Sequence, residues 1–171
     1  MARRKKRIPT PPYRSCYEED QAANLKKRKV AFDYELKQYT FHMPSTKRGL
    51  ICDSCGSTKM KQQAKYTPDF TLYYKGSRKK RFIIVETKGK MLAPVRNKDA
   101  AFVEEYPDID YRLVFMANNK LSRTSKTRYS DWATKVGIKY AVGDIPDAWL
   151  KELGYKVPKN YDTEIRKYYG I

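Results

Sequence analysis

Three charged side chains lie in or at the end of two neighbouring apolar segments, at a spacing that is typical of a catalytic site. Asp69 lies in YTPDFTLYY (66–74), while Glu86 and Lys88 end the apolar run FIIVETK (82–88). Residues two apart in a strand share a face, so Glu86 and Lys88 project together, roughly 6.6 Å apart along the chain. If the two segments pair as antiparallel strands, Asp69 lies across from the end where Glu86 and Lys88 emerge.

The pattern Pro-Asp, sixteen residues, Glu-X-Lys indicates metal-dependent phosphate chemistry. Two carboxylates at a sheet edge suit Mg²⁺, which prefers oxygen ligands and keeps waters. A bound metal polarises a phosphate oxygen and lowers the pKa of an attacking water. Lys88 would orient that water or stabilise the charge that develops on the phosphate. The alternative is a structural ion cluster at a strand end, because such clusters also perturb charges without catalysis.

The elements that must position these residues can be read from periodicity and caps. Ser15 opens a helix in which Ser15-Cys-Tyr-Glu18 fits a capping box, so Glu18 is either a cap or a further acid of the site. A polar turn joins the strands 66–74 and 81–88. A strand, a helix and a strand after this hairpin imply a crossover and a mixed sheet, hence an α/β fold. The remaining predicted elements are a strand at 32–41 with a phase change near 37–39, an irregular stretch at 43–65, helices at 94–105, 128–136 and 146–153, and strands at 111–115 and 138–142.

Charge is the strongest global signal of this 171-residue chain. Lys and Arg number 37 against 19 Asp and Glu, which gives 37 − 19 = +18. Such an excess favours a polyanionic partner, and we expect nucleic acid, with no membrane segment and no signal peptide. The 40 % hydrophobic share includes 15 Tyr, so the core is thin and an oligomer that shares it is expected. Three cysteines without an export signal predict a cytoplasmic protein.

The sequence divides into a disordered basic arm at 1–12, one domain at 13–155 and a Tyr-rich tail at 156–171. The arm is either a phosphate-binding segment or a solubilising tail. Basic side chains in the arm and along the domain are expected to hold several duplex arms by their phosphates. The predicted contacts are Arg3, Arg4, Lys5, Lys6, Arg7, Arg14, Lys90, Lys120, Arg123 and Lys126.

A CxxC motif, Cys52 and Cys55, lies inside the 43–65 bridge. One CxxC supplies two zinc ligands, whereas a structural site needs four. His42 is a candidate third ligand, or two bridges from two chains form a Cys₄ site between subunits. The alternative is a pair of free thiols in a loop. Cys16 is predicted to be a packed, inert thiol on the first helix.

Several blocks of the sequence, in order, resemble the phage endonuclease I group of Holliday-junction resolvases, within the PD-(D/E)XK nuclease superfamily. The blocks are RSCYEED, FDYE, YTPDF, VETKG, YPDIDYRLVF, VGIKYA and IPDAWLKE. They cover most of the span 13–152, apart from the longer 43–65 bridge and a longer hairpin.

The resemblance implies a PD-(D/E)XK restriction-endonuclease-like core, with a mixed sheet flanked by helices, in a domain-swapped homodimer that exchanges N-terminal elements. By the resemblance, Asp69 and Glu86 match metal-binding acids, Lys88 a catalytic lysine and Glu18 an additional helix acid. Each active site then takes Glu18 from one chain and the other three residues from its partner. The implied reaction is Mg²⁺-dependent hydrolysis of DNA phosphodiesters at four-way and other branched junctions, with Mn²⁺ as a substitute, in a phage-infected bacterial cell.

Two other functions stay open at this point. One is a PD-(D/E)XK nuclease that cuts ordinary duplex, as in restriction or transposition. The other is a non-catalytic basic DNA-binding protein in which Asp69, Glu86 and Lys88 are a structural ion cluster.

Overall fold

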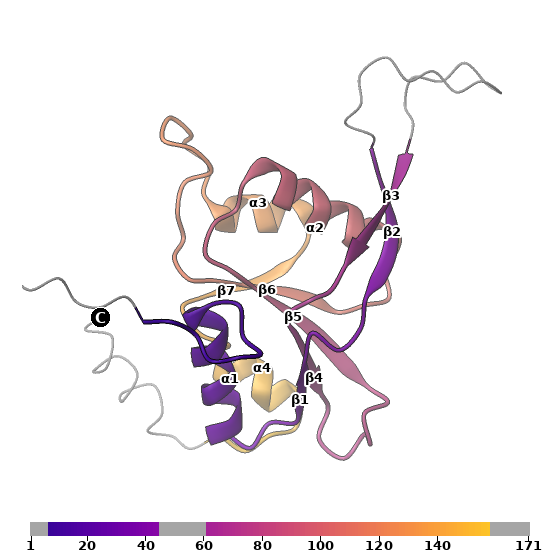
Figure 1. Cartoon of the computed structure of the whole chain (residues 1–171), viewed down its shortest axis with the longest axis vertical. Helices are drawn as coiled ribbons and strands as arrows, with labels where there is room; N and C mark the ends of the chain where they lie inside the picture. Colours follow the sequence, from indigo (N-terminus) through magenta and orange to yellow (C-terminus); the bar gives the residue numbers. More distant parts are fainter. Residues whose placement is uncertain (1–6, 45–60, 158–171) are drawn as a thin grey trace, which may run out of the picture.

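A five-stranded mixed sheet forms the centre of the protein, as a computed structural model describes it for residues 7–44 and 61–157 (Figure 1). The strand order is β1-β4-β5-β6-β7. The strands are β1 (Phe32–Tyr34), β4 (Phe70–Tyr73), β5 (Phe82–Lys88), β6 (Tyr111–Phe115) and β7 (Lys139–Val142). β1, β4 and β5 pair antiparallel, whereas β5, β6 and β7 pair parallel, so the predicted mixed α/β sheet is confirmed.

Helices cover both faces of this sheet (Figure 1). They are α1 (Cys16–Lys27), α2 (Ala93–Glu105), α3 (Tyr129–Val136) and α4 (Asp147–Glu152). On one face, α1 and α4 pack in a cluster with Ile83 and Val85 of β5. On the other face, α2 and α3 pack with Ile84. Because β5 is covered on both sides, its residues from Ile83 to Lys88 are all buried, which explains the continuous apolar run.

A second sheet of two strands, β2 (Tyr39–Pro44) and β3 (Lys61–Tyr66), lies against α2. The strands pair antiparallel from Tyr39 opposite Tyr66 to Pro44 opposite Lys61. Phe102 of α2 is fully buried at the centre of this contact. Its ring lies 5.0–5.9 Å from the ring centroids of five aromatic side chains, which are Tyr39, Phe41, Tyr66, Tyr106 and Tyr111.

Three predicted segments are wrong in their boundaries, and the two sheets explain why. The single strand predicted at 32–41 is two strands, β1 and β2, separated by a turn in which Glu35 has φ 48°. The strand predicted at 66–74 is also divided, because Tyr66 ends β3 while β4 starts at Phe70. Pro68 lies in the break, where a residue without an amide hydrogen cannot continue a ladder. The stretch predicted as irregular at 43–65 contains the end of β2 and most of β3.

The other predicted elements are confirmed to within two residues, including all four helices. Ser15 is the N-cap of α1, and its hydroxyl accepts a hydrogen bond from the backbone N–H of Glu18. Gly137 ends α3 in the left-handed region at φ 80°, which glycine adopts without strain. No helix in the described ranges is both long enough and apolar enough to cross a membrane.

We predict that Phe102→Ala lowers the free energy of unfolding by about 3–5 kcal/mol, since it empties the centre of a buried aromatic cluster. Urea unfolding followed by circular dichroism measures this change. Leu92→Ala is the control, because Leu92 is 63 % exposed and the loss of its side chain is expected to cost less than about 0.5 kcal/mol. Equal losses in the two variants would contradict the role given to Phe102.

Candidate active site

The antiparallel register of β4 and β5 brings Asp69 and Glu86 together. Phe70 lies opposite Val85, so Asp69, one residue before β4, faces Glu86 near the end of β5. The backbone N–H of Asp69 donates to Glu86 Oε2 at 3.0 Å. This is the juxtaposition that an antiparallel hairpin predicts from the sequence.

The carboxylate of Asp69 is buried and held by Thr87, the middle residue of Glu-X-Lys. Oδ2 of Asp69 accepts both the backbone N–H of Thr87, at 2.8 Å, and its hydroxyl, at 2.6 Å. Burial, followed by the negative charge of Glu86, raises the pKa of Asp69 to about 7, although the Thr87 hydrogen bonds oppose the shift. Two carboxylates that repel each other in a buried position favour a bound cation.

Lys88 places a buried ammonium beside these acids. Its Nζ lies 2.7 Å from Glu86 Oε1 and 3.3 Å from Asp99 Oδ1. Burial lowers the pKa of Lys88, but the charges of Glu86 and Asp99 outweigh it, so the pKa is raised overall. Lys88 is therefore a cation and hydrogen-bond donor in this structure, not a free base.

Asp99 of α2 belongs to the same cluster and was missed by sequence reasoning. Its side chain is fully buried, and Oδ1 also accepts the hydroxyl of Tyr111 at 3.1 Å. The Tyr111 hydroxyl in turn lies 2.7 Å from that of Tyr66. A signal was present in the sequence, because Asp99 lies three residues before Phe102 and so shares its buried helix face. A carboxylate on such a face needs a partner.

Glu18, in the first turn of α1, lies near the cluster within the same chain. Its carboxylate accepts hydrogen bonds from the Ser15 hydroxyl at 2.7 Å and the Tyr34 hydroxyl at 2.6 Å. After burial and Glu86, the charge of Glu18 also contributes to the raised pKa of Asp69. Glu18 therefore makes the contacts of a helix cap and also lies near Asp69, so the two roles considered for it do not exclude each other.

A basic loop begins at the same sheet edge. β5 and β6 are parallel, with Lys88 opposite Phe115, and the N–H of Met116 donates to the Lys88 carbonyl at 2.9 Å. The chain after β6 thus leaves the sheet beside Lys88. Between there and α3 it exposes four basic residues, which are Lys120, Arg123, Lys126 and Arg128. Lys90, directly after the turn at Gly89, is exposed as well.

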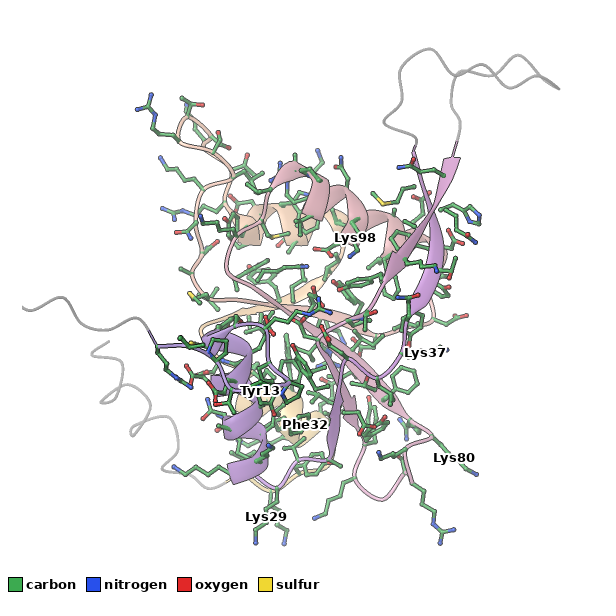
Figure 2. All side chains as sticks on the ribbon, viewed as in Figure 1. Tyr13, Lys29, Phe32, Lys37, Lys80 and Lys98 are labelled. Atoms are coloured by element: carbon green, nitrogen blue, oxygen red, sulfur yellow. The ribbon has the colours of Figure 1, made fainter. Side chains whose placement is uncertain are left out.

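The remaining predicted contacts are only partly described. Arg7 pairs with Glu19 and Asp20 of α1, at 2.7 and 2.6 Å. Arg14 is exposed and pairs with Glu35 at 2.6 Å. The predictions for four residues of the arm and for the CxxC motif fall outside the described residues; these are Arg3, Arg4, Lys5, Lys6, Cys52 and Cys55. Basic groups elsewhere on the surface include Lys29 and Lys80, which both lie toward the bottom of the view in Figure 2.

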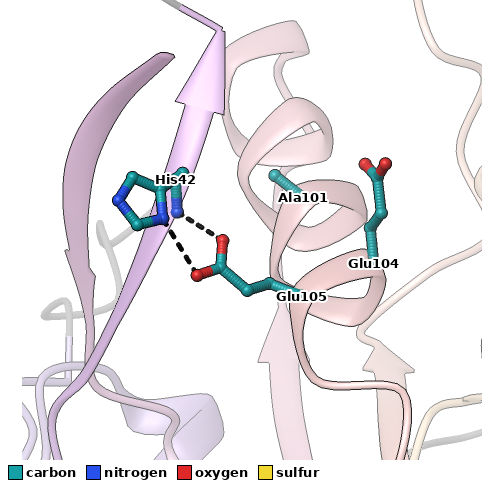
Figure 3. Close-up of a pocket in the computed structure, with 4 residues that line it drawn as sticks. All are labelled: His42, Ala101, Glu104 and Glu105. Carbon is teal, nitrogen blue, oxygen red and sulfur yellow. Dashed lines mark hydrogen bonds and ion pairs between the residues drawn. The ribbon is translucent and has the colours of Figure 1, made fainter.

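His42 and Cys16 occupy positions away from the carboxylate cluster. Figure 3 shows His42 reaching from β2 to Glu105 of α2, where Nδ1 lies 3.0 Å from Oε1 and the backbone N–H donates to Oε2 at 2.7 Å. The two residues line a shallow pocket of about 320 Å³ together with Ala101 and Glu104. Cys16 is half-buried, and its thiol donates to the Arg7 carbonyl at 3.3 Å.

The donor chemistry of the cluster fits a hard divalent cation held by few protein ligands. Within residues 7–44 and 61–157, no three His, Cys, Asp or Glu side chains are grouped closely enough to hold a metal ion. Asp69 and Glu86 therefore form a two-carboxylate donor set, which suits Mg²⁺ because that ion keeps several waters. A sheet edge with two such acids, a buried ammonium and a basic loop is a candidate site for phosphodiester hydrolysis.

Comparison with known proteins agrees with this class of site. The chain matches the phage endonuclease I family over residues 1–167. It is 32 % identical over 147 residues to endodeoxyribonuclease 1 of Enterobacteria phage T3, covering 85 % of this chain and 82 % of that protein. It is 31 % identical over 147 residues to endonuclease I of Escherichia phage T7, covering 85 % and 83 % of the two chains. The chain belongs to the phage endonuclease I family, which confirms the resemblance seen in its sequence blocks and supports a nuclease.

We predict that Asp69→Asn stabilises the metal-free protein at alkaline pH. The pKa of Asp69 is about 7 in the fold, against about 3.9 in an unfolded chain. Its ionised form therefore destabilises the fold; the cost is absent below the unfolded pKa and complete above the folded pKa. From these two pKa values the variant should gain about 4 kcal/mol at pH 8 and only about 1 kcal/mol at pH 4.5.

Urea unfolding in EDTA at the two pH values measures this difference. Asp108→Asn, which removes the same charge from an exposed position, is the control and is expected to change little at either pH. A loss of stability in Asp69→Asn at pH 8 would contradict the assignment of Asp69 as an unfavourable buried charge.

Proposed function

We propose that this protein is a Mg²⁺-dependent, structure-selective DNA endonuclease that resolves four-way and other branched junctions by paired phosphodiester hydrolysis. The observation that carries the proposal is the buried cluster of Asp69, Glu86 and Lys88 at the sheet edge where the basic loop begins. The phage endonuclease names of its relatives support DNA as the substrate and an infected bacterial cell as the setting.

Each residue of the cluster has a distinct role in this proposal. Asp69 and Glu86 would hold Mg²⁺, with Mn²⁺ as a substitute, and the ion when bound supplies polarisation of a phosphate oxygen. Thr87 fixes the Asp69 carboxylate through two hydrogen bonds. Lys88, kept as an ammonium, donates to the phosphate and stabilises the charge that develops during hydrolysis. Glu18 adds a further carboxylate from α1.

Contacts between basic side chains of the protein and DNA phosphates would favour recognition of the shape of the DNA rather than its sequence. Lys90 follows Lys88 by two residues and the loop after β6 starts beside the Lys88 carbonyl, so in this proposal their exposed basic side chains hold the DNA backbone that leads to the scissile bond. Residues that contact phosphates carry no sequence information directly. Selectivity for junctions would then come from how two active sites are arranged in a dimer.

A domain-swapped homodimer is part of the proposal. The described residues form two segments, 7–44 and 61–157, and α1 packs on the second segment through Ala22 and Leu25. In this single chain the contact is made within one molecule. The same contact between two chains would exchange α1 and β1, and a two-fold dimer would then carry the two sites that paired cuts in a symmetric junction require.

Zinc binding by Cys52 and Cys55 stays a prediction. In the structure, His42, the proposed third ligand, hydrogen-bonds Glu105 through its Nδ1. That contact involves Nδ1 and is compatible with zinc ligation through Nε2, so both forms of the proposal stay open: His42 as a third ligand, or two CxxC pairs in a Cys₄ site between chains.

We expect the wild-type protein to cut a four-way junction in Mg²⁺ and not in EDTA, and to leave a linear duplex with the same arm sequences largely intact. Asp69→Asn should lower the rate of junction cleavage by at least about 100-fold, because it removes a carboxylate from the metal site. Denaturing gels of end-labelled strands measure the rates. Asp108→Asn is the matched control and should cut at the wild-type rate.

Equal cutting of both substrates would favour a nuclease of ordinary duplex. No metal-dependent cutting of either substrate would favour a non-catalytic DNA-binding protein.

Exchange of α1 predicts complementation between two inactive chains. If Glu18 acts across the dimer, refolding Glu18→Gln chains with Asp69→Asn chains creates mixed dimers with one intact site. These dimers should nick one strand of a cruciform plasmid without linearising it. Mixing Glu86→Gln with Asp69→Asn chains is the control, because both changes lie in the same segment and no intact site can form. Activity of the first mixture no higher than that of the control would overturn the exchange.

A further inference from the structure

Asp99 lies outside the Asp-Glu-X-Lys pattern but touches its lysine. It is a carboxylate on α2 with 0 % of its side chain exposed, and its Oδ1 lies 3.3 Å from Lys88 Nζ. Glu86, the other partner of Lys88, is on the same strand as the lysine. The ammonium is therefore held from two directions, once from within β5 and once from the helix that covers it.

The two contacts restrict the orientation of the Lys88 ammonium. Lys88 has three N–H donors. The hydrogen bond to Glu86 uses one of them, and the ion pair with Asp99 restrains the ammonium from the side of α2, so the donors that are left point away from these two carboxylates. A lysine side chain otherwise has a large rotamer freedom.

The Asp99 carboxylate is itself oriented from a third element. The hydroxyl of Tyr111, in β6, donates to the same Oδ1 at 3.1 Å, and Tyr66 of β3 lies behind Tyr111. Oδ2 of Asp99 is buried and accepts no hydrogen bond from the part of the chain that the structure describes. An unsatisfied buried carboxylate oxygen is costly, so a residue that served packing alone would be better replaced by an apolar side chain.

We propose that Asp99 is a positioning residue for the nuclease reaction: its ion pair holds the ammonium of Lys88 between β5 and α2, so that an N–H donor not used by Glu86 is aimed at the scissile phosphate. This inference rests on the proposed function of the same site and extends it to α2, an element that carries none of the predicted site residues. Asp99 itself touches neither metal nor DNA in this proposal.

Junction cleavage under saturating and limiting DNA tests the positioning role. Asp99→Asn keeps the size of the side chain and removes its charge, and it should lower kcat by about 10- to 100-fold, as supporting residues of other metal sites do. KM should change by less than about twofold, because surface phosphate contacts dominate DNA affinity. Asp108→Asn is the matched control, since it changes the net charge equally at an exposed site. An unchanged kcat in a folded Asp99→Asn protein would overturn the proposal.

A thermal-unfolding cycle with Lys88→Met tests the contact without cleavage. In the wild-type background, Asp99→Asn should lower Tm, because Lys88 loses one of its two buried partners. In the Lys88→Met background, the same change should raise Tm, because it removes a buried negative charge that has lost its cationic partner and keeps only the Tyr111 hydrogen bond. A loss of Tm in both backgrounds would show that Asp99 acts independently of Lys88 and would overturn the inference. If the wild type cut no DNA, the proposed function would fail while this cycle still reported on the pair.

Tyr111→Phe serves if Asp99→Asn does not fold. It removes one hydrogen bond from Asp99 Oδ1 and leaves the charge in place. A kcat below that of Asp108→Asn with an unchanged KM is expected. A wild-type kcat in this variant would count against the orientation of Lys88 through Asp99.

Discussion

The burial of three carboxylates around one ammonium is the constraint on which the site and much of the surrounding fold depend. Asp69, Glu86 and Asp99 are all buried, and Lys88 is the cation among them. Removing such charges from water costs several kcal/mol for each ion unless hydrogen bonds and opposite charges compensate. Burial raises the pKa of Asp69 to about 7 and that of Asp99 to about 6, so compensation in the metal-free cluster is incomplete. The excess negative charge is what a divalent cation would neutralise.

The mixed topology of the sheet provides the hydrogen bonds that partly compensate for the burial of these carboxylates. β5 pairs antiparallel with β4 on one side and parallel with β6 on the other. The antiparallel partner brings the Asp69 amide to Glu86 and the Thr87 donors to Asp69. The parallel partner places Tyr111 where its hydroxyl reaches Asp99, and it starts the basic loop at the same edge. A purely antiparallel or purely parallel sheet would supply only one of these two sets of contacts.

Local patterns in the sequence predicted the part of the site that depends on one hairpin. Asp69, Glu86 and Lys88 follow from strand periodicity and antiparallel pairing, and the N-cap of the first helix follows from Ser15. The predicted phase change near residues 37–39 coincides with the start of β2 at Tyr39, but the boundary at Tyr66 was not predictable, because it depends on a pairing between segments that are far apart in the chain. Asp99 was missed for a related reason. A carboxylate in a helix of mixed polarity is usually exposed, and only the docking of α2 on β5 makes it a partner of Lys88.

Polar contacts at the base of α1 determine where Glu18 lies relative to Asp69, whichever chain supplies the helix. Gln21 is buried and exchanges hydrogen bonds with Asp144 and the backbone N–H of Ile145. Arg28, also buried, donates to the Ile145 carbonyl at 2.9 Å and pairs with Asp147 at 3.1 Å. Such directional contacts fix the rotation and the height of a helix more strictly than its apolar face does, because buried polar groups must be paired. A helix exchanged between chains would have to make the same bonds, so it would present Glu18 to Asp69 in the same geometry. The small apolar core is therefore sufficient to orient α1, since the orientation of this helix depends on polar pairing as well as on buried apolar area.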